Sequence, residues 1–109
     1  MIRIMVVEDN VDYRTVIALA IDDAADMELT GLFGTTEIAL RTRETTNTLE
    51  QPDILLLDLR LPGMSGLDAI PLIHAVSPTT RIIILSQSDV PSDIVQAISA
   101  GVSGYLLKG

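Results

Sequence analysis

The sequence has no cysteine, a single histidine and few basic residues, and each shortage excludes a class of chemistry. The absence of cysteine from all 109 residues excludes disulfide frameworks, thiolate zinc sites, iron-sulfur ligation and cysteine nucleophiles. Because His74 is the only histidine, His-based triads and poly-histidine metal sites would need a second chain. Any chemistry is therefore expected to rest on carboxylates, hydroxyls and one lysine.

Positive charge and long apolar runs are also scarce. The 7 basic residues lie scattered among 15 acidic ones, for a formal net charge of -8, so no clustered positive surface for direct nucleic-acid binding is expected. The longest apolar runs, such as Val16 to Ile21 and Ile82 to Leu85, are far shorter than the roughly 20 residues of a membrane-spanning helix. The first residues do not show the pattern of a signal peptide. We expect a cytoplasmic protein without a membrane segment.

The apolar residues form blocks of two alternating kinds, which predicts repeated strand-helix units in one undivided domain. Short, largely continuous, β-branched or leucine-rich runs are typical of parallel strands covered on both faces. These runs are Ile2 to Val7, Ile54 to Leu57, Ile82 to Leu85 and Tyr105 to Leu107. The patchier segment Met27 to Phe33 suits an edge strand.

Four helix-like segments lie between the strands. They are Val11 to Ala24, the threonine-rich Thr36 to Leu49, a segment that follows Ser65, and Pro91 to Ala100 before Gly101. Apolar spacings of three and four, a capping pattern and Pro and Gly at the expected ends support them. Pro71 falls inside the third segment, so that helix is expected either to start later or to have a distorted first turn.

A fifth helix is expected to be missing, because the sequence stops two residues after the fifth strand while every earlier strand is followed by a helix. Right-handed crossovers would place the helices on both faces of the sheet. Residues 1–109 would then be a C-terminally truncated domain with open apolar surface beside the first helix. We expect self-association, as a homodimer, or swapping, unless a further segment covers this surface.

Polar residues follow the strands at their carboxyl ends, where ligands gather in open parallel sheets. In chain order they are Glu8 and Asp9, Asp58, Ser86 and Lys108, the only lysine. Three carboxylates at one place repel, because each pair about 4 Å apart costs roughly 4 kcal/mol at an effective dielectric near 20. A cation is therefore expected, and oxygen ligands without histidine or cysteine favour Mg²⁺.

Mg²⁺ held by carboxylates suits phosphate chemistry. A carboxylate can attack phosphorus to form an aspartyl phosphate, while a lysine adds positive charge and a serine donates to a phosphoryl oxygen. Asp58 is the best candidate nucleophile, because it stands alone at the end of a buried central strand. Glu8 and Asp9 form the adjacent pair suited to holding the metal and its water.

Each residue also has a purely structural interpretation. The acidic pair could favour the positive end of a helix dipole, and Asp58 could be a loop acid before a Pro-Gly turn. Ser86 and Lys108 could be ordinary loop residues. Their joint placement at the strand ends favours the functional interpretation.

Four ordered motifs carry a resemblance to a known family. They are Val-Glu-Asp-Asn, Leu-Leu-Leu-Asp-Leu-Arg-Leu-Pro-Gly-Met-Ser-Gly around Asp58, Ile-Leu-Ser, and Ala-Gly-Val-Ser-Gly-Tyr-Leu-Leu-Lys. Together they resemble the receiver domain of bacterial two-component response regulators over essentially the whole chain. The resemblance implies an α/β, flavodoxin-like (CheY-like) fold, a doubly wound five-stranded parallel sheet of order 2-1-3-4-5.

The resemblance also implies a role for each site residue. Asp58 matches the aspartate that a sensor histidine kinase phosphorylates in a Mg²⁺-dependent reaction. Glu8 and Asp9 match the acidic pair, with Asp9 a direct metal ligand beside Asp58. Arg60 matches the residue whose backbone carbonyl completes the metal shell. Ser86 matches the hydroxyl switch residue, Lys108 matches the family's lysine, and Tyr105 matches the switch aromatic. Such a domain is not an enzyme, because slow loss of its own phosphoryl group is its only turnover.

The implied partners are a sensor histidine kinase and an output domain or partner regulator. The stretch from Ser86 to Lys108 is most similar to regulators with a helix-turn-helix DNA-binding output, which implies transcription regulation. Two features depart from the family: Gly109 stands where proline is frequent, and the missing fifth helix removes part of the usual output and dimerisation face.

Three other functions share parts of this pattern. An aspartate-based phosphohydrolase usually has a second aspartate two residues after the nucleophile, where this sequence has Arg60. A flavin or nucleotide binder cradles phosphate with a hydroxyl-rich or glycine-rich loop after the first strand, but the acids from Glu8 to Asp12 would repel phosphate without a metal. A receiver-like module that is never phosphorylated is disfavoured only because every required side chain is present.

Overall fold

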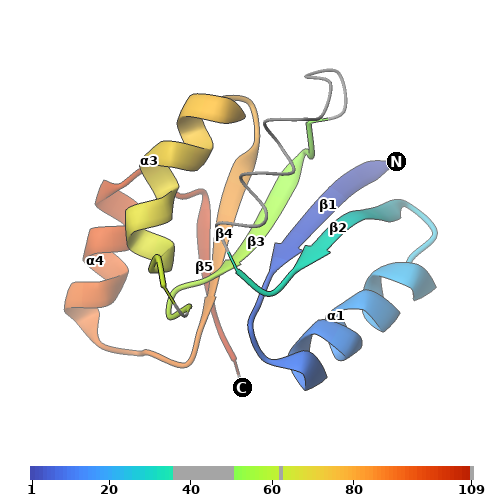
Figure 1. Ribbon diagram of the computed structural model, residues 1–109, viewed down its shortest axis with the longest axis horizontal. Helices are drawn as coiled ribbons and strands as arrows, with labels where there is room; N and C mark the ends of the chain where they lie inside the picture. The colour runs from blue at the N-terminus through green and yellow to red at the C-terminus, as the bar shows by residue number, and fades with distance from the viewer. Residues whose placement is uncertain (36–50, 62, 109) are drawn as a thin grey trace.

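The computed structural model describes residues 1–35, 51–61 and 63–108, and Figure 1 shows a central sheet with helices on both sides. The elements are β1 (Ile2–Val7), α1 (Val11–Asp23), β2 (Met27–Phe33), β3 (Ile54–Asp58), α3 (Gly66–Val76), β4 (Arg81–Ser86), α4 (Pro91–Ser99) and β5 (Gly104–Leu107). The five strands are parallel and lie in the order β2-β1-β3-β4-β5. The predicted fold class, strand order and edge position of β2 are confirmed. The helix expected over Thr36 to Leu49 lies outside the described residues.

Successive side chains of each strand point to opposite faces of the sheet, so alternate residues pack in two separate hydrophobic cores. On one face, Leu55, Leu57, Ile82 and Ile84 pack in a cluster that includes residues of α3 and α4. On the other face, Ile4 and Val6 pack with Ile21 of α1. Figure 1 shows the same division, with α3 and α4 on one side of the sheet and α1 on the other. The continuous apolar runs therefore arise because the central strands are covered on both faces.

Polar caps start the two helices that flank the ends of β1 and β3. The Asn10 side chain accepts hydrogen bonds from the backbone N–H groups of Asp12 (2.9 Å) and Tyr13 (3.1 Å) at the start of α1. The Ser65 side chain accepts one from Asp68 at 3.2 Å and starts α3. Such caps satisfy backbone donors that have no partner within the helix. Both helices consequently begin next to the carboxyl edge of the sheet.

Pro71 lies inside α3, so of the two alternatives expected for this segment, a helix that starts after Pro71 is wrong. The helix begins at Gly66 because its cap and its apolar face against the core are stronger determinants than one lost hydrogen bond. Pro71 is exposed to solvent, where water can satisfy the carbonyl that lacks its N–H partner.

Gly66 is required by a close approach of two backbone segments. A Cβ atom built there would lie 2.4 Å from the Asp58 carbonyl oxygen and 2.9 Å from the Cα atom of Leu59. The Gly66 N–H donates to the Leu59 carbonyl at 2.9 Å. This contact seats the start of α3 directly on the loop that follows β3.

A groove of about 510 Å³ lies on the α1 face of the sheet. Its lining is almost wholly apolar and includes Val16 and Ala20 of α1, Leu56 of β3 and Ile83 of β4. This is the apolar surface that was predicted to lie open beside the first helix. Within the described residues, no helix is both long and apolar enough to cross a bilayer.

Candidate functional site

All predicted site residues except Tyr105 meet in one cavity at the carboxyl edge of the sheet. Its volume is about 450 Å³, and it is lined by Glu8, Asp9, Asn10, Tyr13, Asp58, Arg60, Ser86, Gln87 and Lys108. The lining comes from the ends of β1, β3, β4 and β5 and from the first turn of α1. Parallel strands bring their carboxyl ends to the same edge, which is why segments far apart in sequence converge here.

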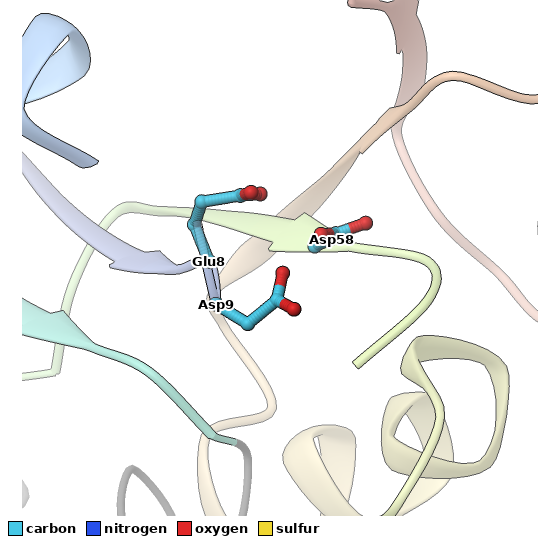
Figure 2. A group of neighbouring side chains, drawn as sticks. All are labelled: Glu8, Asp9 and Asp58. Atoms are coloured by element: carbon cyan, nitrogen blue, oxygen red, sulfur yellow. The ribbon is translucent and has the colours of Figure 1, made fainter. Parts of the chain in front are cut away.

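Three carboxylates gather in this cavity, as Figure 2 shows. One oxygen atom each from Glu8, Asp9 and Asp58 lies within 4.8 Å of the other two. Glu8 is fully buried and Asp58 is 5 % exposed, whereas Asp9 is exposed. Such a set of hard oxygen atoms is suited to Mg²⁺, which usually binds one or two carboxylates and keeps several waters.

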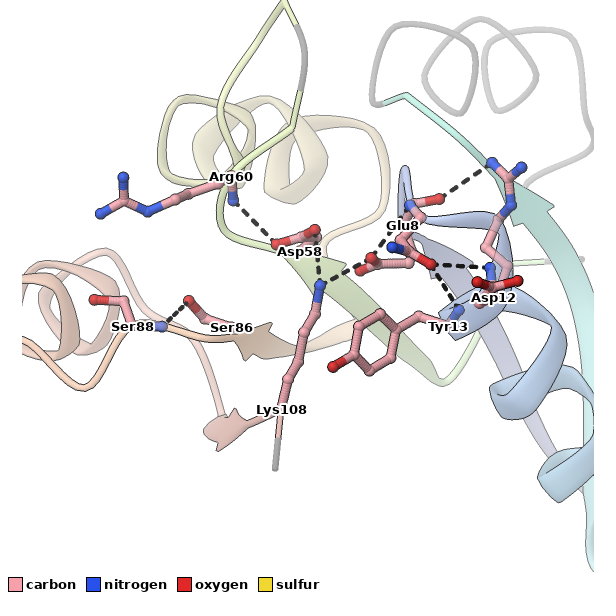
Figure 3. Close-up of polar contacts among 10 residues, drawn as sticks. Glu8, Asp12, Tyr13, Asp58, Arg60, Ser86, Ser88 and Lys108 are labelled. Atoms are coloured by element: carbon pink, nitrogen blue, oxygen red, sulfur yellow. Dashed lines mark hydrogen bonds and ion pairs between the residues drawn. The ribbon is translucent and has the colours of Figure 1, made fainter.

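Lys108 provides the positive charge between the two buried acids. Its Nζ atom lies 2.8 Å from Glu8 Oε1 and 3.0 Å from Asp58 Oδ2, and Figure 3 shows both contacts. The backbone N–H of Lys108 donates to the Ser86 carbonyl at 2.7 Å, so the ladder between β4 and β5 continues to this residue. The side chain is thereby fixed at the centre of the cavity.

Burial and charge move two pKa values at the site. Burial raises the pKa of Glu8, and the neighbouring Asp58 adds to this effect, which outweighs the opposing influence of Lys108. Burial would lower the pKa of Lys108, but hydrogen bonds to Glu8 and Asp58 together with their charges outweigh it, so the pKa is raised. Lys108 therefore carries its positive charge at neutral pH.

The two oxygen atoms of Asp58 have different partners. Oδ2 accepts from Lys108, and Oδ1 accepts from the backbone N–H of Arg60 at 3.1 Å. In contrast, the Oε2 atom of Glu8 is buried and has no hydrogen-bond partner, and among the described residues this is true of no other buried side-chain nitrogen or oxygen atom. A buried carboxylate oxygen without a partner is costly, so this atom marks a place where a cation would be stabilising.

Ser86 lies next to the acids but points away from them. It is 1 % exposed, and its Oγ atom accepts from the backbone N–H of Ser88 at 3.0 Å. Figure 3 shows the hydroxyl directed toward Ser88 rather than toward Asp58. Tyr105 is docked on the same loop, because its hydroxyl donates to the Ser88 carbonyl at 2.9 Å. The two residues predicted to form a switch therefore both contact Ser88.

The sequence analysis missed Tyr13 as a site residue. Lys108 Nζ lies 4.6 Å from the centre of the Tyr13 ring, a distance typical of a cation-π contact. In the sequence, Tyr13 is marked only by its place within the segment Val11 to Ala24, which is expected to form the first helix. Its place three residues after the cap Asn10, in the turn beside the strand ends, is the signal that could have identified it.

Comparisons with known proteins show which family the chain belongs to. Residues 4–109 match the family model of the response regulator receiver domain, and the chain belongs to this family. A LuxR-family two-component response regulator from Aurantimonas is 31% identical, with a TM-score of 0.85 over 98% of this chain and 74% of that one. The receiver domain of NarL from Mycobacterium tuberculosis is 28% identical, with a TM-score of 0.86 over 98% of this chain and 83% of that one.

A curated relative is a longer protein. The nitrate/nitrite response regulator NarL of Escherichia coli is 33% identical over 105 residues, which are 96% of this chain and 47% of the relative. The chain thus spans about half the length of that protein. Membership of the family makes it a signalling domain of two-component systems rather than a classical enzyme.

Proposed function

We propose that this receiver domain accepts a phosphoryl group from a sensor histidine kinase on Asp58 and passes the resulting change to an output domain. The observation that carries the proposal is the setting of the Asp58 carboxylate, which is nearly buried, hydrogen-bonded through both oxygens, and next to Lys108 and two further acids. Such a carboxylate is held in a fixed orientation for attack on phosphorus.

The transfer needs only the kinase phosphohistidine, the Asp58 carboxylate and a proton from water. A carboxylate oxygen of Asp58 bonds to phosphorus as the bond from phosphorus to the kinase histidine nitrogen breaks, and that nitrogen keeps the electron pair and takes a proton. Lys108 stays within reach of the new phosphoryl group and offsets part of its charge of about −1.5 to −2. Ser86, once it turns from Ser88, donates its hydroxyl to a phosphoryl oxygen, and Tyr105 follows the loop.

Mg²⁺ is the proposed metal, held by Glu8, Asp9, Asp58 and the backbone carbonyl of Arg60. The donor set fits, since three oxygens lie within 4.8 Å of one another and Glu8 Oε2 is buried without a partner. When bound, Mg²⁺ supplies positive charge that offsets the phosphoryl oxygens.

We further propose that the domain releases its phosphoryl group only slowly and performs no sustained turnover. The support is Arg60, which stands two residues after Asp58, where a phosphohydrolase would carry a second aspartate. The whole protein is proposed to be cytoplasmic and to regulate transcription through a helix-turn-helix output. This rests on the likeness to the LuxR-family regulator and to NarL; the acidic net charge of −8 speaks against DNA binding by residues 1–109 themselves.

The test is treatment with acetyl phosphate and Mg²⁺, followed by intact-protein mass spectrometry. We expect one added phosphoryl group in the wild type and none in Asp58→Ala. Asp89→Ala is the matched control, because it removes an exposed acid from the loop between β4 and α4 and should leave the adduct unchanged. An adduct that persists in Asp58→Ala, or no adduct in the wild type, contradicts the proposal.

A further inference from the structure

Asp93 is the third residue of α4 and is joined to two loops of the site. Its Oδ2 atom accepts from the Ser88 hydroxyl at 2.6 Å and lies 3.4 Å from an Nη atom of Arg60. Ser88 belongs to the loop after β4, and Arg60 to the loop after β3. One carboxylate therefore connects the start of α4 to both loops that border the phosphoacceptor.

The contact with Ser88 restrains the residue on which Ser86 and Tyr105 depend. Three groups of Ser88 are engaged: its N–H with Ser86 Oγ, its carbonyl with the Tyr105 hydroxyl, and its hydroxyl with Asp93. Ser86 can turn toward a phosphoryl group on Asp58 only if its partner Ser88 gives way. As long as Asp93 holds the Ser88 hydroxyl, the loop is biased against that movement.

The contact with Arg60 holds an exposed cation away from the phosphoacceptor. The Arg60 side chain is 76% exposed, and Figure 3 shows that it extends away from Asp58 and Lys108. Its backbone N–H nevertheless donates to Asp58 Oδ1, so the guanidinium is attached close to the reacting group. A phosphoryl group on Asp58 and the carboxylate of Asp93 would compete for this guanidinium.

From these contacts we propose that Asp93 is a positioning residue that opposes the phosphorylated arrangement: it holds Ser88 and Arg60 in the unphosphorylated one and so couples the charge on Asp58 to the start of α4. The inference rests on the proposed phosphorylation of Asp58. A ligand that favours the phosphorylated arrangement must offset the free energy of the contacts that break when the protein leaves the unphosphorylated one. Removal of the Asp93 contacts should therefore strengthen binding of a phosphoryl mimic.

The experiment is calorimetric titration of fluoroberyllate, a mimic of the aspartyl phosphoryl group, into the protein with Mg²⁺. Asp93→Asn should lower the dissociation constant for fluoroberyllate by about three- to tenfold. This is the size of effect that follows from loss of the half-exposed ion pair with Arg60 and weakening of the charge-assisted hydrogen bond from Ser88. Asp89→Asn removes the same charge from an exposed position nearby and should change it by less than about twofold. A thermal melt of each variant checks that the fold is retained.

A second set of variants tests whether Asp93 acts through its two partners. In a chain that carries both Arg60→Gln and Ser88→Ala, Asp93→Asn should give no further gain in affinity, because the contacts it would release are already gone. A gain that persists there, an unchanged dissociation constant in the single variant, or weaker binding would each overturn the proposal for Asp93. If the wild type itself fails to bind fluoroberyllate, both this inference and the proposed phosphorylation of Asp58 are wrong.

Discussion

Replacement of Lys108 by methionine should destabilise the metal-free protein at neutral pH. Nζ lies 2.8 Å from Glu8 and 3.0 Å from Asp58, and each contact corresponds to roughly 6 kcal/mol of attraction at an effective dielectric near 20. Desolvation cancels much of this gain, and removal of one partner from a buried ion pair usually costs about 3–5 kcal/mol. Glu8 can take up a proton in the variant and so avoid a buried unpaired charge. We therefore expect the free energy of unfolding to fall by about 2–4 kcal/mol.

The pH dependence of this loss follows from the directions of the two pKa shifts. The pKa of Lys108 is raised above 10.5, so its contribution is complete at neutral pH and disappears only as pH rises through the raised value. In Lys108→Met, Glu8 and Asp58 lose their cation, and the pKa of Glu8, already above 4.5, rises further. The folded variant then binds protons more readily than the unfolded chain, so its deficit should shrink as pH falls toward about 5.

Urea denaturation measures this deficit at neutral and mildly acidic pH, with and without Mg²⁺. The deficit should be largest at neutral pH without metal and should shrink when Mg²⁺ replaces the lost charge. Arg81→Met removes an exposed cation from the far end of β4 and should change stability by less than about 0.5 kcal/mol. A variant as stable as the wild type, or a deficit that does not depend on pH, would refute the assignment of Lys108 as the charge that balances the two acids.

Four further outcomes are expected. Gly66→Ala should slow phosphorylation by acetyl phosphate and cost about 1–3 kcal/mol in urea denaturation, because the new Cβ would lie 2.4 Å from the Asp58 carbonyl oxygen; unchanged values would show that the loop yields freely. Mg²⁺ should raise the melting temperature of the wild type, and Asp9→Asn should reduce that increase. An equal increase in Asp9→Asn would show that Asp9 is not a metal ligand. Tyr105→Phe should cost about 0.5–1.5 kcal/mol by loss of the bond to Ser88, measured by thermal unfolding, and no loss would mean that the bond is not formed in solution. Sedimentation of residues 1–109 at rising concentration should show self-association through the groove beside α1, and a uniform monomer would contradict this.

The fold was predictable because its signals are local or periodic. The run from Ile2 to Val7 matches β1 residue for residue, since its last four residues are buried and Arg3 is its one polar residue. The end of β3 was placed one residue early, because the charged side chain of Asp58 hid the fact that its backbone still pairs with Leu85. Pro71 was ambiguous, because propensity alone cannot weigh one lost hydrogen bond against a cap and a buried face.

The candidate site was predictable only as far as strand ends determine position. The acids, Ser86 and Lys108 follow strands of one sheet, so their convergence follows from topology. The contact of Asp93 with Arg60 and Ser88 depends on side-chain rotamers and on the path of two loops, and no spacing in the sequence indicates it. The docking of Tyr105 on the Ser88 carbonyl is hidden for the same reason.

The central claim is that a divalent cation bound by crowded acids allows Asp58 to capture a phosphoryl group. The most direct measurement is treatment with acetyl phosphate, reduction of the acyl phosphate with borohydride, and peptide mass spectrometry to locate the reduced residue, with either Mg²⁺ or a chelator present. The account predicts reduction at Asp58 alone and only with Mg²⁺. Reduction at another acid, or equal reduction in the presence of the chelator, would contradict it.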